Sequence, residues 1–353
     1  MTVDKQEVNT WSVARAHTNI ALIKYWGKRD EKLFLPTSPS LSLTLDSLYT
    51  DTRVRFDPKL SSDELWLAGE KQDDKSTVKI TRVIDLFRAR YSVPEQTPRM
   101  RVESVNHVPT AAGLASSSSG FAALAWALRD AFESAFPQTV AMDDRELSTF
   151  ARRGSGSATR SIFGGFVEWS YGTGSNDSCA IPVDDARWDV AMVLAAISTQ
   201  HKKISSTYGM KHTAETSSFY SLWREASEQD LATVREGIRE RDIDKIGAAM
   251  EANCMKFHAT MFAANPPFTY LTSRSWRVIE FVHEMRDSGL SVYFTMDAGP
   301  NVKILCRASE QQFVHDKLAE RFPEITLFDA LPGSGPETLS KDKWAQMYGG
   351  IYG

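Results

Sequence analysis

Alternating and continuous apolar runs predict most of the strands of this chain. The segment that begins at Trp11 alternates, then becomes continuously apolar and breaks at Gly27, as expected of a buried strand that leads into a loop. Apolar residues recur at every second position from Leu35 to Asp57, which predicts antiparallel strands joined by a turn around Asp46 and Ser47. Further apolar runs predict strands at residues 99–106, 188–197, 291–296 and 302–307.

Apolar residues spaced three and four positions apart predict helices between these strands. The predicted helices cover residues 77–91, 121–135, 218–239, 242–263, 272–288 and 310–321, and a further helix is predicted to begin near Asp143. A chain of 353 residues is long enough to bury two packed cores. A polar junction at residues 183–187 separates the two halves, so we expect one domain over residues 1–185 and a second over 186–353.

Composition and charge exclude several classes of protein. The net charge of -4 and the absence of a long basic run argue against a nucleic-acid partner or an anionic membrane surface. No apolar stretch is long enough to span a bilayer, and the first residues lack the order of a signal peptide, so a cytoplasmic protein is expected. Three widely spaced cysteines indicate neither a disulfide framework nor a structural zinc site.

A polar, glycine-containing loop precedes the long apolar helix that ends at Ala135. A helix start of this kind offers unpaired N–H groups and a positive dipole end, which suit a phosphate. Backbone and hydroxyl donors are expected from Gly113, Ser116, Ser117, Ser118 and Ser119. The sequence is neither a Walker A motif nor G-x-G-x-x-G, and a serine-rich cap on a buried helix is the alternative interpretation.

A second cluster of small residues lies at 154–158, and Arg160 follows it. Backbone N–H groups can converge on an anion there, and the guanidinium suits a carboxylate or phosphate. The alternative is a tight helix crossing with a solvated arginine. Arg152 and Arg153 are expected at the surface. Two anion sites, together with Lys24 and Lys28 beside a turn, indicate two polyanionic ligands.

Two apolar runs flank the string D-A-G-P-N, so Asp297 is predicted to leave a strand and face a cleft. A routine turn-forming aspartate is the alternative. His17 and His258 lack metal-ligand neighbours and are expected to be structural.

Five ordered strings resemble one known family. They are N-I-A-L-I-K-Y-W-G-K-R-D, P-T-A-A-G-L-A-S-S, S-G-S-A-T-R, S-S-T-Y-G-M and M-D-A-G-P-N, between Asn19 and Asn301. The second resembles a motif of the GHMP small-molecule kinase superfamily, and the set resembles its diphosphomevalonate decarboxylase family. That family more often has Ala at the positions of Ser118 and Ser119. The resemblance implies an α+β fold, with an N-terminal half like ribosomal protein S5 domain 2 and a ferredoxin-like C-terminal half.

The resemblance also implies roles for single residues. Asp297, Arg160 and Lys24 are expected to be catalytic, with Arg160 also holding the substrate carboxylate. The other substrate contacts are expected from Tyr25, Lys28, Ser155, Gly156, Ser157 and Thr207. The serine loop and, more weakly, Ser178 are expected to bind the phosphates of ATP. Mg²⁺ is implied as cofactor, but its ligands are not indicated by the sequence.

The reaction implied by the resemblance converts ATP and 5-diphosphomevalonate to ADP, phosphate, carbon dioxide and isopentenyl diphosphate, in a homodimeric enzyme. Three alternatives remain open on the sequence. The first is a GHMP kinase that does not decarboxylate, and the second is a decarboxylase that prefers a monophosphate. The third is a non-enzymatic homologue that senses a ligand, although the charged residues it would be expected to lose are all present.

Overall fold

The computed structural model describes residues 10–108, 116–198 and 203–352. Within these ranges the larger sheet has eight strands, in the order β14-β1-β4-β7-β5-β6, with β8 paired to β4 and β9 paired to β8. Its strands are β1 (Trp11–Ile23), β4 (Ser40–Asp57), β5 (Glu64–Leu67), β6 (Glu70–Lys71), β7 (Arg99–Asn106), β8 (Phe166–Trp169), β9 (Ala180–Asp184) and β14 (Glu337–Thr338). The strand prediction for residues 99–106 is confirmed.

The predicted turn at Asp46 and Ser47 is wrong, because β4 runs through both residues as one strand. The register between β1 and β4 shifts here: His17 pairs with Tyr49, whereas Asn19 pairs with Thr44. The extra residues of β4 therefore form an irregularity of the bulge type, which exposes two polar side chains without reversing the chain.

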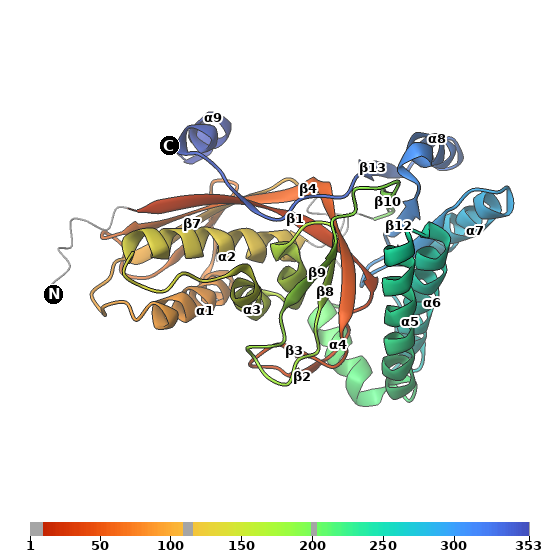
Figure 1. Cartoon of the computed structure of the whole chain (residues 1–353), viewed down its shortest axis with the longest axis horizontal. Coiled ribbons are helices and arrows are strands. Elements are labelled where there is room, and N and C mark those ends of the chain that lie inside the picture. The colour runs from red at the N-terminus through yellow and green to blue at the C-terminus, as the bar shows by residue number, and fades with distance from the viewer. Residues whose placement is uncertain (1–9, 109–115, 199–202, 353) are drawn as a thin grey trace.

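Three helices cover one face of this sheet: α1 (Asp74–Arg90), α2 (Ser116–Ala135) and α3 (Asp144–Gly154) (Figure 1). Their apolar residues form one core with inward-facing residues of β1, β4, β5 and β7. Helix α2 begins earlier than predicted, so the serines lie in its first turn. The last helix, α9 (Lys341–Tyr352), packs Trp344 and Tyr348 against Val13 of β1.

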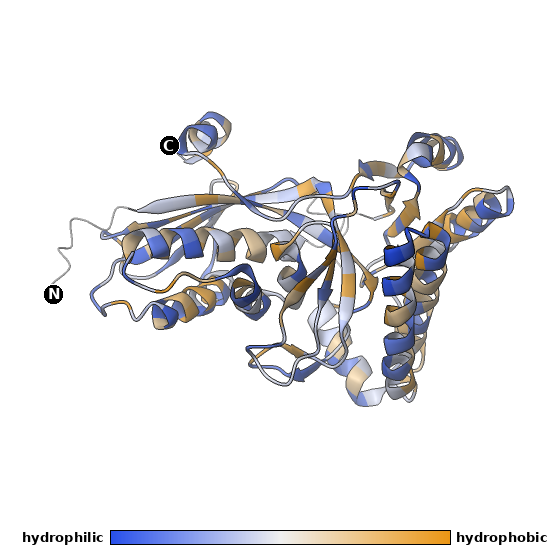
Figure 2. Ribbon diagram, in the orientation of Figure 1, coloured by the Kyte–Doolittle hydropathy of each residue, from blue (hydrophilic) through white to orange (hydrophobic). Residues whose placement is uncertain are grey.

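A second sheet of four strands has the order β11-β12-β10-β13 in the described residues. The strands are β10 (Ala191–Ala196), β11 (Tyr293–Met296), β12 (Val302–Cys306) and β13 (Thr326–Ala330). The predicted helices of this half are confirmed as α5 (Tyr220–Glu240), α6 (Ile243–Phe262), α7 (Ser273–Asp287) and α8 (Gln311–Arg321). Figure 2 shows hydrophilic and hydrophobic residues mixed along these helices, as their sequence pattern predicts.

Side chains cap the starts of several helices, and one of these caps, Ser205, lines the cleft described below. The caps accept hydrogen bonds from the first-turn N–H groups and are Asp73, Asp143, Ser205, Asp242 and Thr272. Ser205 begins α4 (Ser206–Thr216), and α3 is followed by the short helix η2 (Gly156–Ile162). The remaining short elements are β2 (Lys28–Asp30), β3 (Leu35–Pro36) and η3 (Ala308–Glu310).

A continuous core joins the two sheets. It includes Leu43 of β4, Leu194 of β10 and Met250 of α6. The predicted boundary at residue 185 stays a prediction, and β14 and α9 return from the C-terminal half to the first sheet. Within the ranges given above, no helix combines the length and apolar character that a membrane span requires.

Candidate active site

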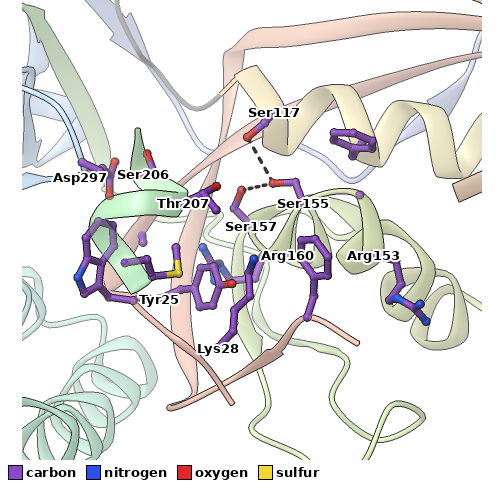
Figure 3. A pocket seen from close by; sticks show the side chains of 18 of the residues that line it. Tyr25, Lys28, Ser117, Arg153, Ser155, Ser157, Arg160, Ser206, Thr207 and Asp297 are labelled. Carbon is purple, nitrogen blue, oxygen red and sulfur yellow. Dashed lines mark hydrogen bonds between the residues drawn. The ribbon is translucent and has the colours of Figure 1, made fainter. Parts of the chain in front are cut away.

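A cleft of about 1240 Å³ lies where the end of β1, the starts of α2 and α4, helix η2 and the turn after β11 come together (Figure 3). Its lining is strongly cationic. The basic residues in the lining are Lys24, Lys28, Lys32, Lys79, Arg82, Arg153 and Arg160, and the acidic ones are Glu31 and Asp297. Such an excess of positive charge within one cleft favours polyanionic ligands.

Asp297 leaves β11 and faces the cleft, as the sequence predicts. Its carboxylate lies between two ammonium groups: Lys24 Nζ is 2.8 Å from Oδ1, and Lys303 Nζ is 3.0 Å from Oδ2. Burial alone would raise the pKa of Asp297, but the charges of the two lysines outweigh it and lower that pKa overall. Asp297 is therefore an anion throughout the physiological pH range.

Lys24 is buried and held in place from two directions. Its ammonium donates to the Ala21 carbonyl at 2.8 Å, and its backbone N–H donates to Asn253 Oδ1 at 2.9 Å. The amide nitrogen of Asn253 in turn donates to Ser227 and Asp230 of α5. Helices α5 and α6 thus fix the loop after β1, and they aim Lys24 at Asp297.

Lys303 is a site residue that the sequence reasoning missed. It is the one charged residue in β12, a strand whose five residues are all buried. A lysine flanked by apolar neighbours in a buried strand must find a counter-charge, and this was the available signal. The residue that neutralises it lies only six positions earlier, on the adjacent strand exit.

Arg160 is buried on η2, and its hydrogen-bond partners in the described structure are all uncharged. The guanidinium donates to Ser42 Oγ at 2.9 Å, to Asn19 Oδ1 at 3.3 Å and to Ser40 Oγ. Burial lowers the pKa of Arg160 to about 10, so the group stays protonated at neutral pH. No carboxylate of the described residues forms an ion pair with this buried cation, although Asp297 acts on it through space, and the cleft can admit a further carboxylate.

The residues predicted to contact the substrate come together on one side of the cleft. Ser155 Oγ lies 3.3 Å from Ser117 Oγ and 3.2 Å from Ser157 Oγ (Figure 3). The Tyr25 hydroxyl is buried and has no hydrogen-bond partner among the described residues. Lys28, Gly156 and Thr207 also line the cleft. The hydroxyls and the unpartnered phenol provide donors that an anionic ligand can use.

The serine loop divides into two pairs. Ser116 and Ser117 line the cleft, whereas Ser118 and Ser119 are buried. Ser119 Oγ lies 2.7 Å from Thr50 Oγ1, and Thr18 Oγ1 donates to it at 3.3 Å. The first pair can reach a phosphate, whereas Ser118 and Ser119 do not line the cleft; their expected contact with ATP stays a prediction. Gly113 lies outside the described residues.

Ser178 and Arg152 also differ from expectation. Ser178 is buried away from the cleft, where its hydroxyl accepts from Trp169 Nε1 at 3.0 Å and donates to the Ser170 carbonyl. Arg152 is not a surface residue, because its guanidinium is fully buried and donates to the backbone carbonyls of Leu33, Ser175 and Ser178. Neither residue lines the cleft, whereas Arg153 does. The expected contact of Ser178 with ATP stays a prediction.

Neither of the two histidines lines the cleft. His17 Nδ1 lies 3.2 Å from the Ser334 carbonyl. His258 is buried against the Phe257 ring, and burial lowers its pKa to about 3. Among the described residues, no three side chains of His, Cys, Asp or Glu are grouped so as to hold a metal ion.

The fold and the cleft define a two-domain protein with mixed helices and sheets that binds polyanions between its halves. A model of the diphosphomevalonate decarboxylase-like N-terminal domain matches residues 16–180, and one of the mevalonate 5-diphosphate decarboxylase C-terminal domain matches residues 192–343. The chain belongs to the diphosphomevalonate decarboxylase family. The fold class expected from the sequence, that of the GHMP kinases, is thereby confirmed.

Individual relatives cover nearly the whole chain. Human diphosphomevalonate decarboxylase is 36% identical over 345 residues, which are 92% of this chain and 82% of that protein. The structure of mevalonate diphosphate decarboxylase from Staphylococcus aureus has a TM-score of 0.88 and 43% identity, over 96% of this chain and all of that one. A second solved structure, that of MDDEF in complex with MVAPP, AMPPCP and magnesium, has a TM-score of 0.86 and 44% identity. The match covers 94% of this chain and 99% of that one.

Proposed function

We propose that the protein catalyses the ATP-dependent decarboxylation of 5-diphosphomevalonate to isopentenyl diphosphate, with ADP, phosphate and carbon dioxide as the other products. The observation that carries the proposal is the ionised Asp297 in a cleft that also holds the buried cation Arg160. The Asp297 carboxylate suits the tertiary alcohol of the substrate, and the Arg160 guanidinium suits the substrate carboxylate. Family membership supports the same activity.

The first chemical step makes a leaving group, because a tertiary hydroxide departs poorly. Asp297 accepts a hydrogen bond from the substrate hydroxyl and orients its oxygen toward the terminal phosphorus of ATP. As the new oxygen–phosphorus bond forms and the bond to ADP breaks, the hydroxyl proton passes to an oxygen of the transferred phosphoryl group and later leaves with the phosphate, so Asp297 stays an anion. Phosphoryl transfer has a loose transition state in which positioning and charge stabilisation matter more than a strong base. The low pKa of Asp297 is therefore compatible with this role, and Lys24 stabilises charge on the transferring phosphoryl group.

The second step removes phosphate and carbon dioxide. Departure of phosphate leaves positive charge on the tertiary carbon, and the Asp297 anion is close enough to the former hydroxyl to stabilise it. Arg160 holds the carboxylate so that its C–C bond is aligned for cleavage. The diphosphate tail is bound by Lys28, Tyr25 and the Ser155–Ser157 segment, far from the reacting carbon.

The residues present fit nucleotide-bound magnesium. Magnesium binds mostly through substrate phosphates and water, with few protein ligands, and the hydroxyls of Ser116 and Ser117 lie at the start of α2 where such phosphates would bind. When bound, the ion neutralises charge on the phosphates of ATP. The solved relative that contains MVAPP, AMPPCP and magnesium supports this assignment.

A coupled assay tests the proposal. Purified protein is given ATP, magnesium and diphosphomevalonate, and ADP and carbon dioxide are measured in parallel. Equal amounts of both support the decarboxylase, whereas ADP without carbon dioxide would show a kinase that stops at the phosphate ester. Mevalonate monophosphate in place of the diphosphate tests the other alternative. The cytoplasmic location and the homodimer stay predictions, which cell fractionation and size-exclusion chromatography would check.

A further inference from the structure

Asp297 is held by two lysines that come from different sheets. Lys24 follows β1 of the larger sheet, and Lys303 lies in β12 of the smaller sheet, opposite Thr295 of β11. Each ammonium contacts a different carboxylate oxygen, at 2.8 Å for Lys24 and 3.0 Å for Lys303. Both lysine side chains are only 2% exposed, whereas 30% of the Asp297 side chain remains open to the cleft. The two buried lysines therefore fix the carboxylate on its protein side, and its other side remains accessible from the cleft.

Charge balance shows that this arrangement exceeds what folding requires. A buried carboxylate needs one buried cation to neutralise it, and Lys24 already provides that cation. A second buried ammonium carries a desolvation cost of its own without a second carboxylate to offset it. Such an uncompensated cation is expected where the state of a functional group matters more than stability.

We propose that Lys303 is a positioning residue that acts through Asp297 in the reaction. It binds Oδ2, which prevents the carboxylate from rotating, and it keeps the group ionised when the substrate alcohol and the later positive carbon lie against it. The inference rests on the proposed decarboxylase function and adds a residue to it. Lys303 itself does not line the cleft, so it is not expected to touch the substrate.

Other groups near Asp297 define what remains when Lys303 is removed. Lys24 and Arg160 are cationic, and both favour the ionised carboxylate. On α6, burial lowers the pKa of His258 and raises the pKa of the Cys254 thiol, so both are neutral near pH 7. Removal of Lys303 therefore takes away a large part of the field that lowers the pKa of Asp297.

The test uses Lys303→Met, which has nearly the same length and no charge. We expect kcat to fall about 100-fold, the size typical of losing one preorganised electrostatic contact, while KM for ATP and diphosphomevalonate changes less than about threefold. The acid limb of the profile of kcat/KM against pH should move to higher pH, because the pKa of Asp297 rises. Lys303→Arg keeps the charge and should restore part of kcat.

Lys245→Met is the matched control, since Lys245 lies on α6 and pairs with Glu236 and Glu240 far from the cleft lining. Its kcat and acid limb should equal those of the wild type. If Lys303→Met fails to fold by circular dichroism, Lys303→Gln replaces it with the same expected loss. A folded variant with unchanged kcat and an unmoved acid limb would overturn the inference.

A double-mutant cycle separates action through Asp297 from an independent role. In an Asp297→Asn background, adding Lys303→Met should change the residual turnover less than about threefold, because the group it orients is already lost. If the two substitutions instead reduce turnover by independent factors that multiply in the double variant, the positioning role is refuted. Wild-type release of carbon dioxide is measured first: its absence rejects the proposed function, whereas an active wild type with an indifferent Lys303 rejects only the present inference.

Discussion

Replacing Arg160 by methionine should separate activity from stability. The change removes three hydrogen bonds from a charged group to Asn19, Ser40 and Ser42, each worth about 1.5–3 kcal/mol. It also removes a buried cation that has no ion pair with a carboxylate in the described part of the chain, and the effective desolvation penalty of such a group is several kcal/mol. The two effects have opposite signs and similar size. We therefore expect the free energy of unfolding to change by less than either effect alone would give.

Turnover should respond very differently to the same substitution. A charge-assisted contact to the substrate carboxylate is worth about 2–5 kcal/mol when its partner is truncated, which corresponds to a loss of roughly 30-fold to several thousand-fold in kcat/KM. Release of carbon dioxide at saturating ATP measures the loss, and urea unfolding measures stability. A folded variant that decarboxylates at the wild-type rate would refute the assignment of a substrate clamp.

Arg152→Met is the matched control, because Arg152 is equally buried and lies eight positions earlier. Its guanidinium serves backbone carbonyls of Leu33, Ser175 and Ser178, which would lose a donor. Removing Arg152 also removes a buried cation, but unsatisfied buried carbonyls cost about 1–3 kcal/mol each. Backbone carbonyls cannot rotate to a new partner as the serine hydroxyls around Arg160 can, so this variant should lose more stability than Arg160→Met. Its folded fraction should retain most of its turnover, which is the reverse of the result expected for Arg160→Met.

Three further outcomes are expected. Asp297→Asn should lose orders of magnitude in carbon dioxide release while its circular dichroism spectrum stays native; near-normal product formation would reject its role. Gly156→Ala should raise KM for diphosphomevalonate about tenfold or more, measured by initial rates, because an added Cβ would lie 2.7 Å from the Tyr25 ring. His258 stays neutral in the folded protein because burial lowers its pKa to about 3, whereas the unfolded chain binds a proton below about pH 6.5. Wild-type stability in urea should therefore fall from pH 6.5 towards pH 3, and His258→Leu should lose about 1.4 kcal/mol less per pH unit; equal slopes would contradict a buried neutral histidine.

Features set by neighbouring residues could be predicted from the sequence. The exit of Asp297 from a strand, the helix starts near Asp143 and Thr272, and the small residues around Gly156 all depend on local turn and capping preferences. The resemblance to a known family then connected these local features to one cleft.

Features set by distant contacts could not be predicted. The turn residues Asp46 and Ser47 lie in a continuous strand because β1 pairs with β4 on both sides of them. Neighbouring serines have different surroundings because successive helical residues point about 100° apart. Ser117 thus lines the cleft, while Ser119 turns toward Thr50 of the sheet.

Arginines of similar sequence context show the same limit. Arg152 and Arg160 follow small or polar residues, yet one is surrounded by backbone carbonyls and the other by side-chain hydroxyls. Two of these acceptors, Leu33 for Arg152 and Ser42 for Arg160, lie more than a hundred residues away from their arginine in the chain. No pattern in the neighbouring sequence distinguishes an arginine that stabilises a loop from one that is expected to bind a ligand.

The charge balance at the centre of the cleft links the site to its chemistry. Lys24, Lys303 and Arg160 are buried cations. Asp297 forms ion pairs with the two lysines and lines the same cleft as Arg160. A protein selected for stability alone would replace such an excess of buried cations by apolar side chains. Their retention is physically reasonable if the missing negative charge arrives with the ligands: a carboxylate at Arg160 and phosphates near Lys24. The same excess keeps Asp297 ionised, and an ionised carboxylate is what a developing positive carbon requires.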